Sequence, residues 1–450
     1  MVSISGIRGI VGTSLTPEII VKYASAFAEY TKRGRIVLGR DGRLTGKSIA
    51  HLVSSTLLQM GCDVSAIGVC PTPTVALAVE KTRAAGGIAV TASHNPMQWN
   101  GLKFFAPTGM FLDAEENREL WRIAEQPNRQ YAPWEKQGTH ASLEHFIATH
   151  IKTALSLPYV DAGRIRKKKF KIILDCVDSA GGVIVPTLLK QLGCNVIPMN
   201  CDVSGIFSHT PEPVPANLKD LSRRVRKEKA DLGIAVDPDV DRLVLLDETG
   251  APIGEEYTVA TAVKFLLSKT AKRATQTVVV NLSTTRAIDD IAAAFKARVL
   301  RTAVGEINVA KKMKEVGAIV GGEGNGGVIL PRVHYVRDAI VGVVLTLQHL
   351  SEFGGTLSEL KRSLPEYHIT KGKIELGSLD PDRALAAMKG KYSGSGKINT
   401  EDGLKIDFAE SWVHLRKSNT EPIVRIIAEA PTERGAEELV TRFTNELAGV

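Results

Sequence analysis

A helix–glycine–strand unit that recurs along the chain constrains its fold more than any other feature. The stretch Leu-Leu-Gln-Met-Gly-Cys-Asp-Val at residues 57–64 is echoed by Leu-Leu-Lys-Gln-Leu-Gly-Cys-Asn-Val at 188–196, and more loosely by residues 292–300. In the first two copies a helix ends, a glycine follows, and a strand begins. Self-similarity of this kind indicates repeated structural units. We therefore expect three related α/β domains.

The length of 450 residues is too great for a single hydrophobic core. The expected fold class is α/β with four domains. Three related mixed-sheet α/β domains should occupy residues 1–150, 151–252 and 253–366, and a C-terminal α+β domain should occupy residues 367–450.

Alternation of strands and helices supports the α/β class in the first domain. Helices are expected from Pro17 to about Lys32 and from Ser48 to Met60. The strands expected there cover residues 35–38, 62–67 and 88–92, with a hairpin return at 100–105. In the last domain, strands at 368–376, 404–408 and 423–429 should precede a helix from about Thr432.

Composition points to a cytoplasmic protein without a nucleic-acid or membrane partner. The net charge is +8, but aromatic residues make up only 5%, and the only tight basic runs are residues 164–169 and 223–227. The five cysteines show no CxxC pair and fit core positions in a reducing compartment. The N-terminus lacks a signal-peptide core, and no apolar run reaches the roughly 18 residues of a membrane span. We expect a monomer or homodimer.

Four polar loops carry candidate functional residues. In the first, residues 88–92 read as a buried strand that ends in Ser93-His94-Asn95-Pro96, where Asn-Pro favours a turn. Ser93 is then either the cap of a following helix or a hydroxyl placed for chemistry.

The second loop, Asp237-Pro238-Asp239-Val240-Asp241-Arg242, lies between apolar strands at 232–236 and 243–246. Carboxylates at every second position should point to one side of an extended segment. Because three such groups repel one another, they are best explained by a hard cation, Mg²⁺ or Ca²⁺. Arg242 stands where a Ca²⁺-binding EF-hand loop requires glycine, which excludes that motif. A solvated acidic turn is the alternative.

The third and fourth loops suit a phosphorylated sugar. Residues 321–327, Gly-Gly-Glu-Gly-Asn-Gly-Gly, follow an expected strand at 318–320; their glycines allow close approach, and Glu323 and Asn325 suit sugar hydroxyls, although a flexible hairpin would look similar. Residues 416–422, Arg-Lys-Ser-Asn-Thr-Glu-Pro, with Arg425 beyond them, have the ingredients of a phosphate cradle or of an exposed basic turn.

In this order the loops resemble those of the α-D-phosphohexomutase family, which includes phosphoglucomutases, phosphomannomutases and phosphoglucosamine mutases. Residues 91–96 match its phosphoserine loop, 237–242 its Mg²⁺ loop, 322–326 its sugar loop and 416–422 its phosphate loop; residues 5–9, 39–42 and 100–103 fit as well. The resemblance spans the whole chain. It implies four domains around a central cleft.

The resemblance also implies residue roles. Ser93 would carry a phosphoryl group, with His94, Arg8 and Lys103 as further catalytic groups. One Mg²⁺ per chain would be held by Ser93, Asp237, Asp239 and Asp241. A hexose 1,6-bisphosphate would be the intermediate and the activator. The residues expected to bind substrate are Glu323, Asn325, Arg242, Arg416, Ser418, Asn419, Thr420 and Arg425.

Two positions depart from the pattern of many members: Asn325 replaces a serine and Gly327 replaces a histidine. Without that histidine, Lys103 or Arg8 becomes a candidate for proton transfer, and Gly327 is expected to leave room that the histidine would fill. The Glu-Gly-Asn-Gly-Gly version resembles archaeal-type phosphoglucosamine mutases, which also occur in some bacteria. The resemblance therefore implies interconversion of glucosamine 6-phosphate and glucosamine 1-phosphate, with phosphomannomutase/phosphoglucomutase as the alternative.

Two other classes share some of these parts. A metal-dependent sugar-phosphate phosphatase would also use acidic loops and a phosphate cradle, but it has no need to retain a bisphosphate. A non-enzymatic sugar-phosphate sensor would keep the cradle without needing the serine and the metal loop. The presence of both loops places the sensor last.

Overall fold

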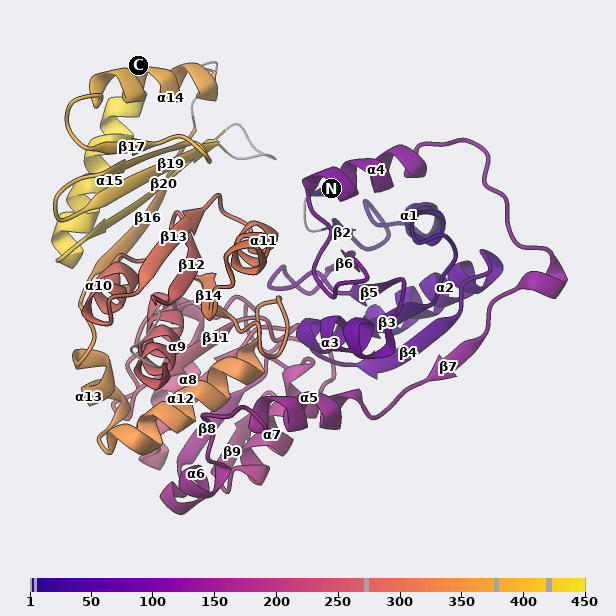
Figure 1. Cartoon of the computed structure of the whole chain (residues 1–450), viewed down its shortest axis with the longest axis horizontal. Helices are drawn as coiled ribbons and strands as arrows, with labels where there is room; N and C mark the ends of the chain where they lie inside the picture. The colour runs from indigo at the N-terminus through magenta and orange to yellow at the C-terminus, as the bar shows by residue number, and fades with distance from the viewer. Residues whose placement is uncertain (1, 4–5, 271–274, 376–379, 418–422, 450) are drawn as a thin grey trace. The chain divides into compact units, whose positions relative to one another are not determined.

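The computed structural model describes residues 2–3, 6–270, 275–375, 380–417 and 423–449 (Figure 1). The chain divides into two compact units, Met1–Phe265 with Asn325–Lys361, and Leu266–Gly324 with Arg362–Val450. Within the described residues, no helix has the length and apolar character needed to cross a membrane.

The first unit begins with a seven-stranded mixed sheet of order β1-β2-β6-β5-β3-β4-β7. β3 is parallel to β4 and β5, whereas β6 is antiparallel to β5 and β2. The strands are β1 (Val2–Ser3), β2 (Gly6–Ile10), β3 (Ile36–Arg40), β4 (Val64–Val69), β5 (Gly86–Val90), β6 (Trp99–Phe105) and β7 (His140–Ser142). The helices are α1 (Pro17–Tyr30), α2 (Gly46–Gln59), α3 (Thr72–Thr82) and α4 (Ala114–Ala124), with a 3-10 turn at Trp134–Lys136.

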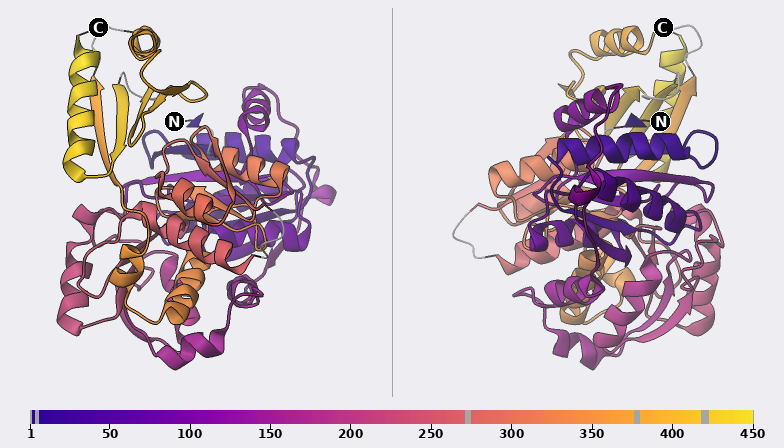
Figure 2. Two further views of the ribbon diagram at one scale, coloured as in Figure 1. Left: turned by 60° about the vertical axis from the view of Figure 1, so that its left-hand side comes forward. Right: turned by 90° about the vertical axis from the view of Figure 1, so that its right-hand side faces the viewer.

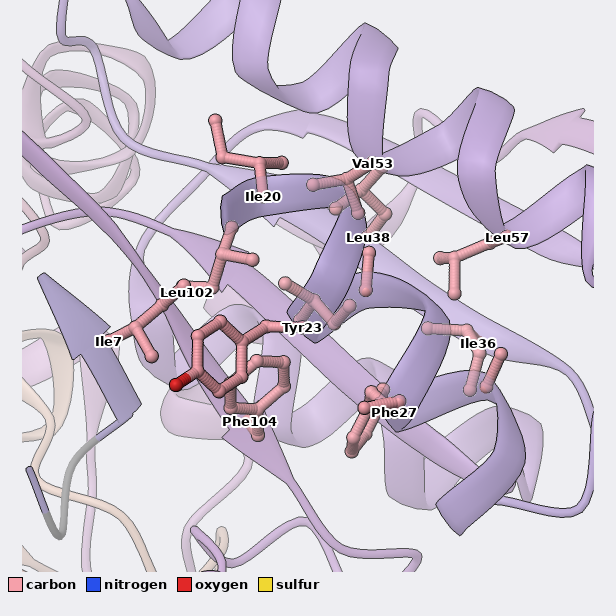
Figure 3. Packing of buried hydrophobic residues seen from close by; sticks show 14 of the residues in the cluster. Ile7, Ile20, Tyr23, Phe27, Ile36, Leu38, Val53, Leu57, Leu102 and Phe104 are labelled. Carbon is pink, nitrogen blue, oxygen red and sulfur yellow. The ribbon is translucent and has the colours of Figure 1, made fainter. Parts of the chain in front are cut away.

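Helices cover both faces of this sheet. Ile36 and Leu38 of β3 pack with α1 and α2 in one core, whereas Val37 packs with α3 in the other. Figure 3 shows the first core, in which Phe27 and Phe104 lie with their ring centroids 4.9 Å apart. Full burial of each such side chain contributes about 1.5–3 kcal/mol, which makes the sheet a rigid support for the loops at its edge.

The first unit also contains a four-stranded mixed sheet of order β11-β10-β8-β9. β8 is parallel to β9 and β10, and β10 and β11 form an antiparallel hairpin. Its strands are β8 (Lys171–Asp175), β9 (Asn195–Met199), β10 (Leu232–Val236) and β11 (Leu243–Leu246). The remaining elements of the unit are α5 (Phe146–Leu155), α6 (Ala162–Lys168), α7 (Gly181–Gln191), the 3-10 turn Pro215–Asn217, α8 (Lys219–Glu228), β15 (Gly327–Ile329), α12 (Ala339–Phe353) and α13 (Leu357–Arg362, whose last residue falls in the second unit), and most of α9 (Glu255–Lys269).

The second unit holds two further sheets. Parallel strands in the order β13-β12-β14 form the first of them. The other is antiparallel, of order β16-β20-β19-β18-β17, with α15 packed along it (Figure 2). The strands are β12 (Thr277–Asn281), β13 (Arg298–Thr302), β14 (Val320–Glu323), β16 (His368–Glu375), β17 (Lys397–Asn399), β18 (Leu404–Asp407), β19 (Trp412–Lys417) and β20 (Ile423–Ala430). The helices are α10 (Ala287–Ala294), α11 (Glu306–Val316), α14 (Pro381–Lys391) and α15 (Glu433–Ala448).

These sheets confirm the predicted fold class, three α/β domains followed by an α+β domain; the central cleft stays a prediction. The repeat is also visible in the backbone. After α2 and α7, Gly61 and Gly193 adopt positive φ values of 86° and 70°, and after α10 Lys296 takes this role at 55°.

Several element boundaries differ from the predictions. Gly39 and Arg40 belong to β3, Gly86 and Gly87 to β5, and Arg416 and Lys417 to β19, because pairing with neighbouring strands overrides their weak strand propensity. The sequence analysis also missed β17, β19 and α14. Cys62, Cys70 and Cys176 are buried as expected, whereas Cys194 and Cys201 are only partly buried.

Candidate active site

Ser93 lies in the turn between β5 and β6, so the helix-capping alternative is wrong: no helix follows it. Its backbone is left-handed, with φ of 50°, and its side chain is buried. The Ser93 amide donates to Thr91 Oγ1 at 2.9 Å, and the Asn95 amide donates to the Ala92 carbonyl at 3.1 Å. A strained, buried serine held by its neighbours is typical of a functional turn.

Arg43 holds this turn in place through hydrogen bonds from its guanidinium. Its guanidinium is fully buried and donates to the carbonyls of Ser93 at 2.5 Å, Asn95 at 2.7 Å, Pro96 at 2.8 Å and Trp99 at 2.9 Å. Its Nε donates to Asp41 Oδ2 at 3.1 Å, and the same oxygen accepts the Thr91 hydroxyl at 2.7 Å. The polar segment at the end of β3, one of those that fit the family pattern, therefore supports the serine turn.

The three aspartates of residues 237–241 are fully buried, and each places a carboxylate oxygen within 4.8 Å of the others. The segment is a tight turn. The sequence analysis expected an extended segment, and that expectation is wrong. Val240 has φ of 61°, its amide donates to the Asp237 carbonyl at 3.0 Å, and Asp237 Oδ1 accepts the amides of Asp241 and Arg242 at 3.1 Å each. The turn, and not strand alternation, brings the carboxylates together.

The serine turn and the acidic turn meet. Ser93 Oγ donates to Asp237 Oδ2 at 3.1 Å, and Lys103 Nζ lies 2.6 Å from Asp239 Oδ2 and 3.4 Å from Asp241 Oδ2. Burial and the two neighbouring aspartates raise the pKa of Asp237 well above its usual range. Burial also acts to raise the pKa of Asp239, but the charge and hydrogen bond of Lys103 outweigh it and lower that pKa.

Arg8, His94 and Arg242 lie around the serine. His94 Nδ1 is 3.4 Å from Ser93 Oγ, and Arg8 donates to Asn95 Oδ1 at 3.2 Å. Arg242 Nη1 and His94 Nε2 share the carboxylate of Glu212, at 3.5 and 3.9 Å. Burial, Arg242 and Arg8 lower the pKa of His94 to about 2, so this imidazole is neutral. The structure thus groups all four predicted catalytic residues with the acidic turn.

Two side chains that the sequence analysis missed also hold the acidic turn. The hydroxyl of Thr72, at the start of α3, donates to Asp239 Oδ2 at 2.6 Å, and Arg337 donates to Asp241 Oδ2 at 2.7 Å. The aliphatic stem of Arg337 passes Gly327 so closely that a Cβ there would lie 2.2 Å from Arg337 Cδ. The expectation of free space beside Gly327 is therefore wrong, because Arg337 fills it.

A buried chain of hydrogen bonds ties these two supports together. Thr74 on α3 bonds His150 Nδ1 at 2.8 Å, and the Nε2 atoms of His150 and His334 lie 2.8 and 3.1 Å from Asp338 Oδ2. The Val336 amide donates to His334 Nδ1 at 3.2 Å, which leaves Nε2 as the donor of that ring. These hydrogen bonds connect α3 and α5 with the segment that leads into α12.

The predicted sugar and phosphate residues divide between the units. In the first, Asn325 Oδ1 is buried without a hydrogen-bond partner among the described residues. In the second, Glu323 ends β14 instead of lying in a loop, and its Oε1 accepts from Asn281 Nδ2 at 2.8 Å and from the Gly305 amide at 3.1 Å.

Arg416 and Arg425 are directly opposite each other on β19 and β20, and Arg416 Nε lies 2.9 Å from Asp402 Oδ2. Opposed like charges destabilise a sheet unless an anion offsets them. The other predicted phosphate-loop residues, Ser418, Asn419 and Thr420, lie outside the described residues.

Family models described as phosphoglucomutase/phosphomannomutase α/β/α domains I, II and III and C-terminal domain match residues 2–130, 148–250, 254–367 and 373–446. The chain belongs to this family. It is 35% identical to a "Probable phosphoglucosamine mutase" of Methanopyrus kandleri over 98% of this chain and 96% of that protein. It is 36% identical to a "Phosphoglucomutase/phosphomannomutase" of Thermococcus kodakarensis over 96% and 95% of the two chains.

The fold is shared with solved structures of the same family. A phosphoglucomutase/phosphomannomutase family protein from Burkholderia thailandensis superposes with a TM-score of 0.87 at 23% identity, covering 100% of this chain and 98% of that one. The resemblance inferred from the loops is therefore confirmed. As a phosphohexomutase, the chain is an intramolecular phosphotransferase, and so an isomerase.

The acidic turn of this phosphohexomutase fits the metal on which its family depends. Asp239 Oδ1 and Asp241 Oδ1 are buried without hydrogen-bond partners among the described residues, and this is costly unless a ligand satisfies them. Carboxylate oxygens without nitrogen or sulfur ligands suit a hard divalent cation.

Proposed function

We propose that this phosphohexomutase interconverts glucosamine 6-phosphate and glucosamine 1-phosphate through a phosphoserine at Ser93 and a hexose 1,6-bisphosphate. The observation that carries the proposal is the contact between Ser93 Oγ and Asp237 Oδ2, at 3.1 Å, within a buried group of three carboxylates. A hydroxyl placed there can accept and return a phosphoryl group.

In this proposal Asp237, Asp239, Asp241 and phosphorylated Ser93 hold one Mg²⁺. When bound, Mg²⁺ neutralises negative charge that develops on the phosphoryl oxygens. Lys103 and Arg337 balance two of the three aspartate charges beside it, at 2.6 Å from Asp239 and 2.7 Å from Asp241. Since its two carboxylate neighbours favour the ammonium form, we assign Lys103 to charge balance and not to proton transfer.

Each turnover has two phosphoryl transfers. Phosphoserine first transfers its group to the open hydroxyl of the hexose monophosphate, and the proton of that hydroxyl replaces the phosphoryl group on Ser93 Oγ. The resulting bisphosphate then returns its other phosphoryl group to Ser93. When Ser93 accepts, its hydroxyl proton leaves toward Asp237 Oδ2, which already accepts that hydrogen bond at 3.1 Å. His94 is a weak acceptor because its pKa is lowered to about 2. Arg8 and Arg242 supply guanidinium donors for phosphoryl oxygens beside the serine.

We assign the non-reacting phosphate to Arg416 and Arg425, which face each other on β19 and β20. Two facing guanidiniums suit a dianion. The proposal includes Ser418, Asn419 and Thr420, which follow Arg416 in the sequence.

The substrate assignment rests on Glu323 and on the relatives. Two donors hold one carboxylate oxygen of Glu323, which fixes an acidic group that favours a protonated 2-amino group over a neutral hydroxyl. A relative from Sulfurisphaera tokodaii, 32% identical, is named a phosphoglucosamine/phosphogalactosamine mutase. The Thermococcus kodakarensis relative, named a phosphoglucomutase/phosphomannomutase, supports the alternative of a neutral hexose.

Side-by-side kinetics test the assignment. We expect kcat/KM for glucosamine 6-phosphate to exceed that for glucose and mannose phosphates by about tenfold, a difference of about 1.4 kcal/mol. Glu323→Gln should remove most of this preference, whereas Glu119→Gln on the exposed face of α4 should leave it unchanged. Activation by added hexose 1,6-bisphosphate checks the mutase cycle separately. Equal or better turnover of mannose 1-phosphate would move the substrate to the alternative and leave the mechanism standing.

A further inference from the structure

A second pocket in the first unit is lined by basic and hydroxyl side chains. It has a volume of about 400 Å³, and its polar lining consists of Arg40, Lys47, His51 and His140 with three serines. No aspartate or glutamate lines it. Pockets of about 300–1,000 Å³ are the size of small-molecule sites, so the volume suits a small metabolite and not a macromolecule.

The position of this pocket in the fold favours a ligand site. Arg40 and Gly68 lie at the carboxyl ends of the parallel strands β3 and β4, the edge at which α/β sheets bind ligands. The pairing of β3 with β4 is irregular between Leu38 and Gly39, and bulges of this kind are common beside binding sites. Gly68, with φ of 73° and open space at its Cβ position, leaves the backbone exposed to an approaching ligand.

The pocket is separate from the acidic turn. Side chains alternate along a strand, so Arg40 lies on the same face of β3 as Ile36 and Leu38, and Val37 lies on the opposite face. The face with Ile36 and Leu38 is the one that α2 covers. Thr72, which contacts Asp239, begins α3 on the opposite face with Val37. A ligand beside Lys47 and His51 of α2 would therefore lie across the sheet from the metal-binding carboxylates.

The basic side chains of the pocket form no close ion pairs in the part of the chain that the structure describes. Among the residues that the structure describes, no carboxylate forms an ion pair with Arg40, Lys47, His51 or His140. Arg40 donates to the carbonyl of Asp41 at 3.0 Å, and burial lowers the pKa of its guanidinium. At the acidic turn, by contrast, Lys103 and Arg337 are paired with carboxylates. A group of basic side chains without close ion pairs suits an anionic ligand.

We propose that this pocket binds a small phosphorylated metabolite, distinct from the substrate of the serine turn. Arg40 and Lys47 would bind the phosphate, and the imidazoles and serine hydroxyls would donate to its ester oxygen or to neighbouring hydroxyls. The inference is independent of the hexose that the mutase prefers.

Histidine-detected NMR of the full chain tests the site, with glycerol 3-phosphate as the probe. The side-chain signals of His51 and His140 are assigned with the variants His51→Gln and His140→Gln. Both signals should shift as the probe is added, until the site is saturated. Sodium chloride of equal ionic strength should not reproduce the shift. Lys47→Gln and Arg40→Gln should each weaken the affinity at least tenfold. Lys81→Gln, an exposed lysine on α3, is the matched control and should leave the affinity unchanged.

Any of four results would overturn the proposal. The two histidine signals could stay fixed, or they could follow ionic strength alone, or Lys47→Gln could bind the probe as tightly as the unmodified chain. A shift confined to His94 would place the probe at the serine turn and would also count against the site. Because Lys47 is exposed, its variant keeps the test valid even if Arg40→Gln fails to fold.

Discussion

Replacement of Arg43 by lysine tests whether the serine turn depends on a single buried guanidinium. Arg43 satisfies four backbone carbonyls and Asp41 Oδ2. A lysine ammonium has three donors, so at least two of these five hydrogen bonds to the charged group are lost. At about 1–3 kcal/mol for each lost hydrogen bond to a charged donor, the turn should lose about 2–6 kcal/mol of local stability.

Hydrogen exchange is the suitable assay, because a chain of several domains does not unfold in a single two-state step. A peptide covering residues 91–99 should lose protection by about 30-fold to 10⁴-fold, at about 1.4 kcal/mol for each factor of ten. Mutase activity should fall with it, since Ser93 would leave its left-handed conformation.

Arg122→Lys provides the matched control, because Arg122 pairs with Glu119 on the exposed surface of α4. It should leave the exchange of the 91–99 peptide unchanged. Full activity of Arg43→Lys together with a protection loss below about threefold would refute the assignment of Arg43 as the support of the turn.

Three further changes address the remaining parts of the site and the second unit. Ser93→Ala should abolish phosphorylation at this position and nearly all mutase activity; peptide mapping by mass spectrometry checks this, and phosphate found only at another residue in an active variant would contradict it. Asp239→Asn should weaken divalent-metal binding at least tenfold by calorimetry while the fold is retained, and unchanged activity after chelation of the unmodified enzyme would remove the metal from the mechanism. His414, buried between Ser283 and the Asp402 carbonyl, has a pKa lowered from 6.5 to about 4, first by burial. Because the unfolded chain binds the extra proton below pH 6.5, stability should fall by up to about 3 kcal/mol as the pH drops from 6.5 to 4. His414→Gln should flatten this dependence in the hydrogen exchange of residues 412–417, and parallel curves for both proteins would contradict it.

The sequence by itself determined the parts of the fold that depend on local pattern. The apolar runs 232–236 and 243–246 become β10 and β11 with the predicted bounds, because turn residues limit both runs. Asn95-Pro96 marks the turn between β5 and β6, because these residues favour turns. The order of the four loops was enough to indicate the family, because each loop carries its chemistry in consecutive residues.

Only the tertiary structure decided how the acidic turn is held. Arg337 contacts Asp241 across 96 positions of the chain, and Thr72 contacts Asp239 across 167. No local pattern marks such partners, because their hydrogen bonds form only after distant helices pack together. From the sequence, Gly327 was expected to leave free space, yet the Arg337 side chain occupies the space beside it. Three buried carboxylates need partners that donate hydrogen bonds or balance charge. Only the packing of the folded chain determines which distant residues become those partners.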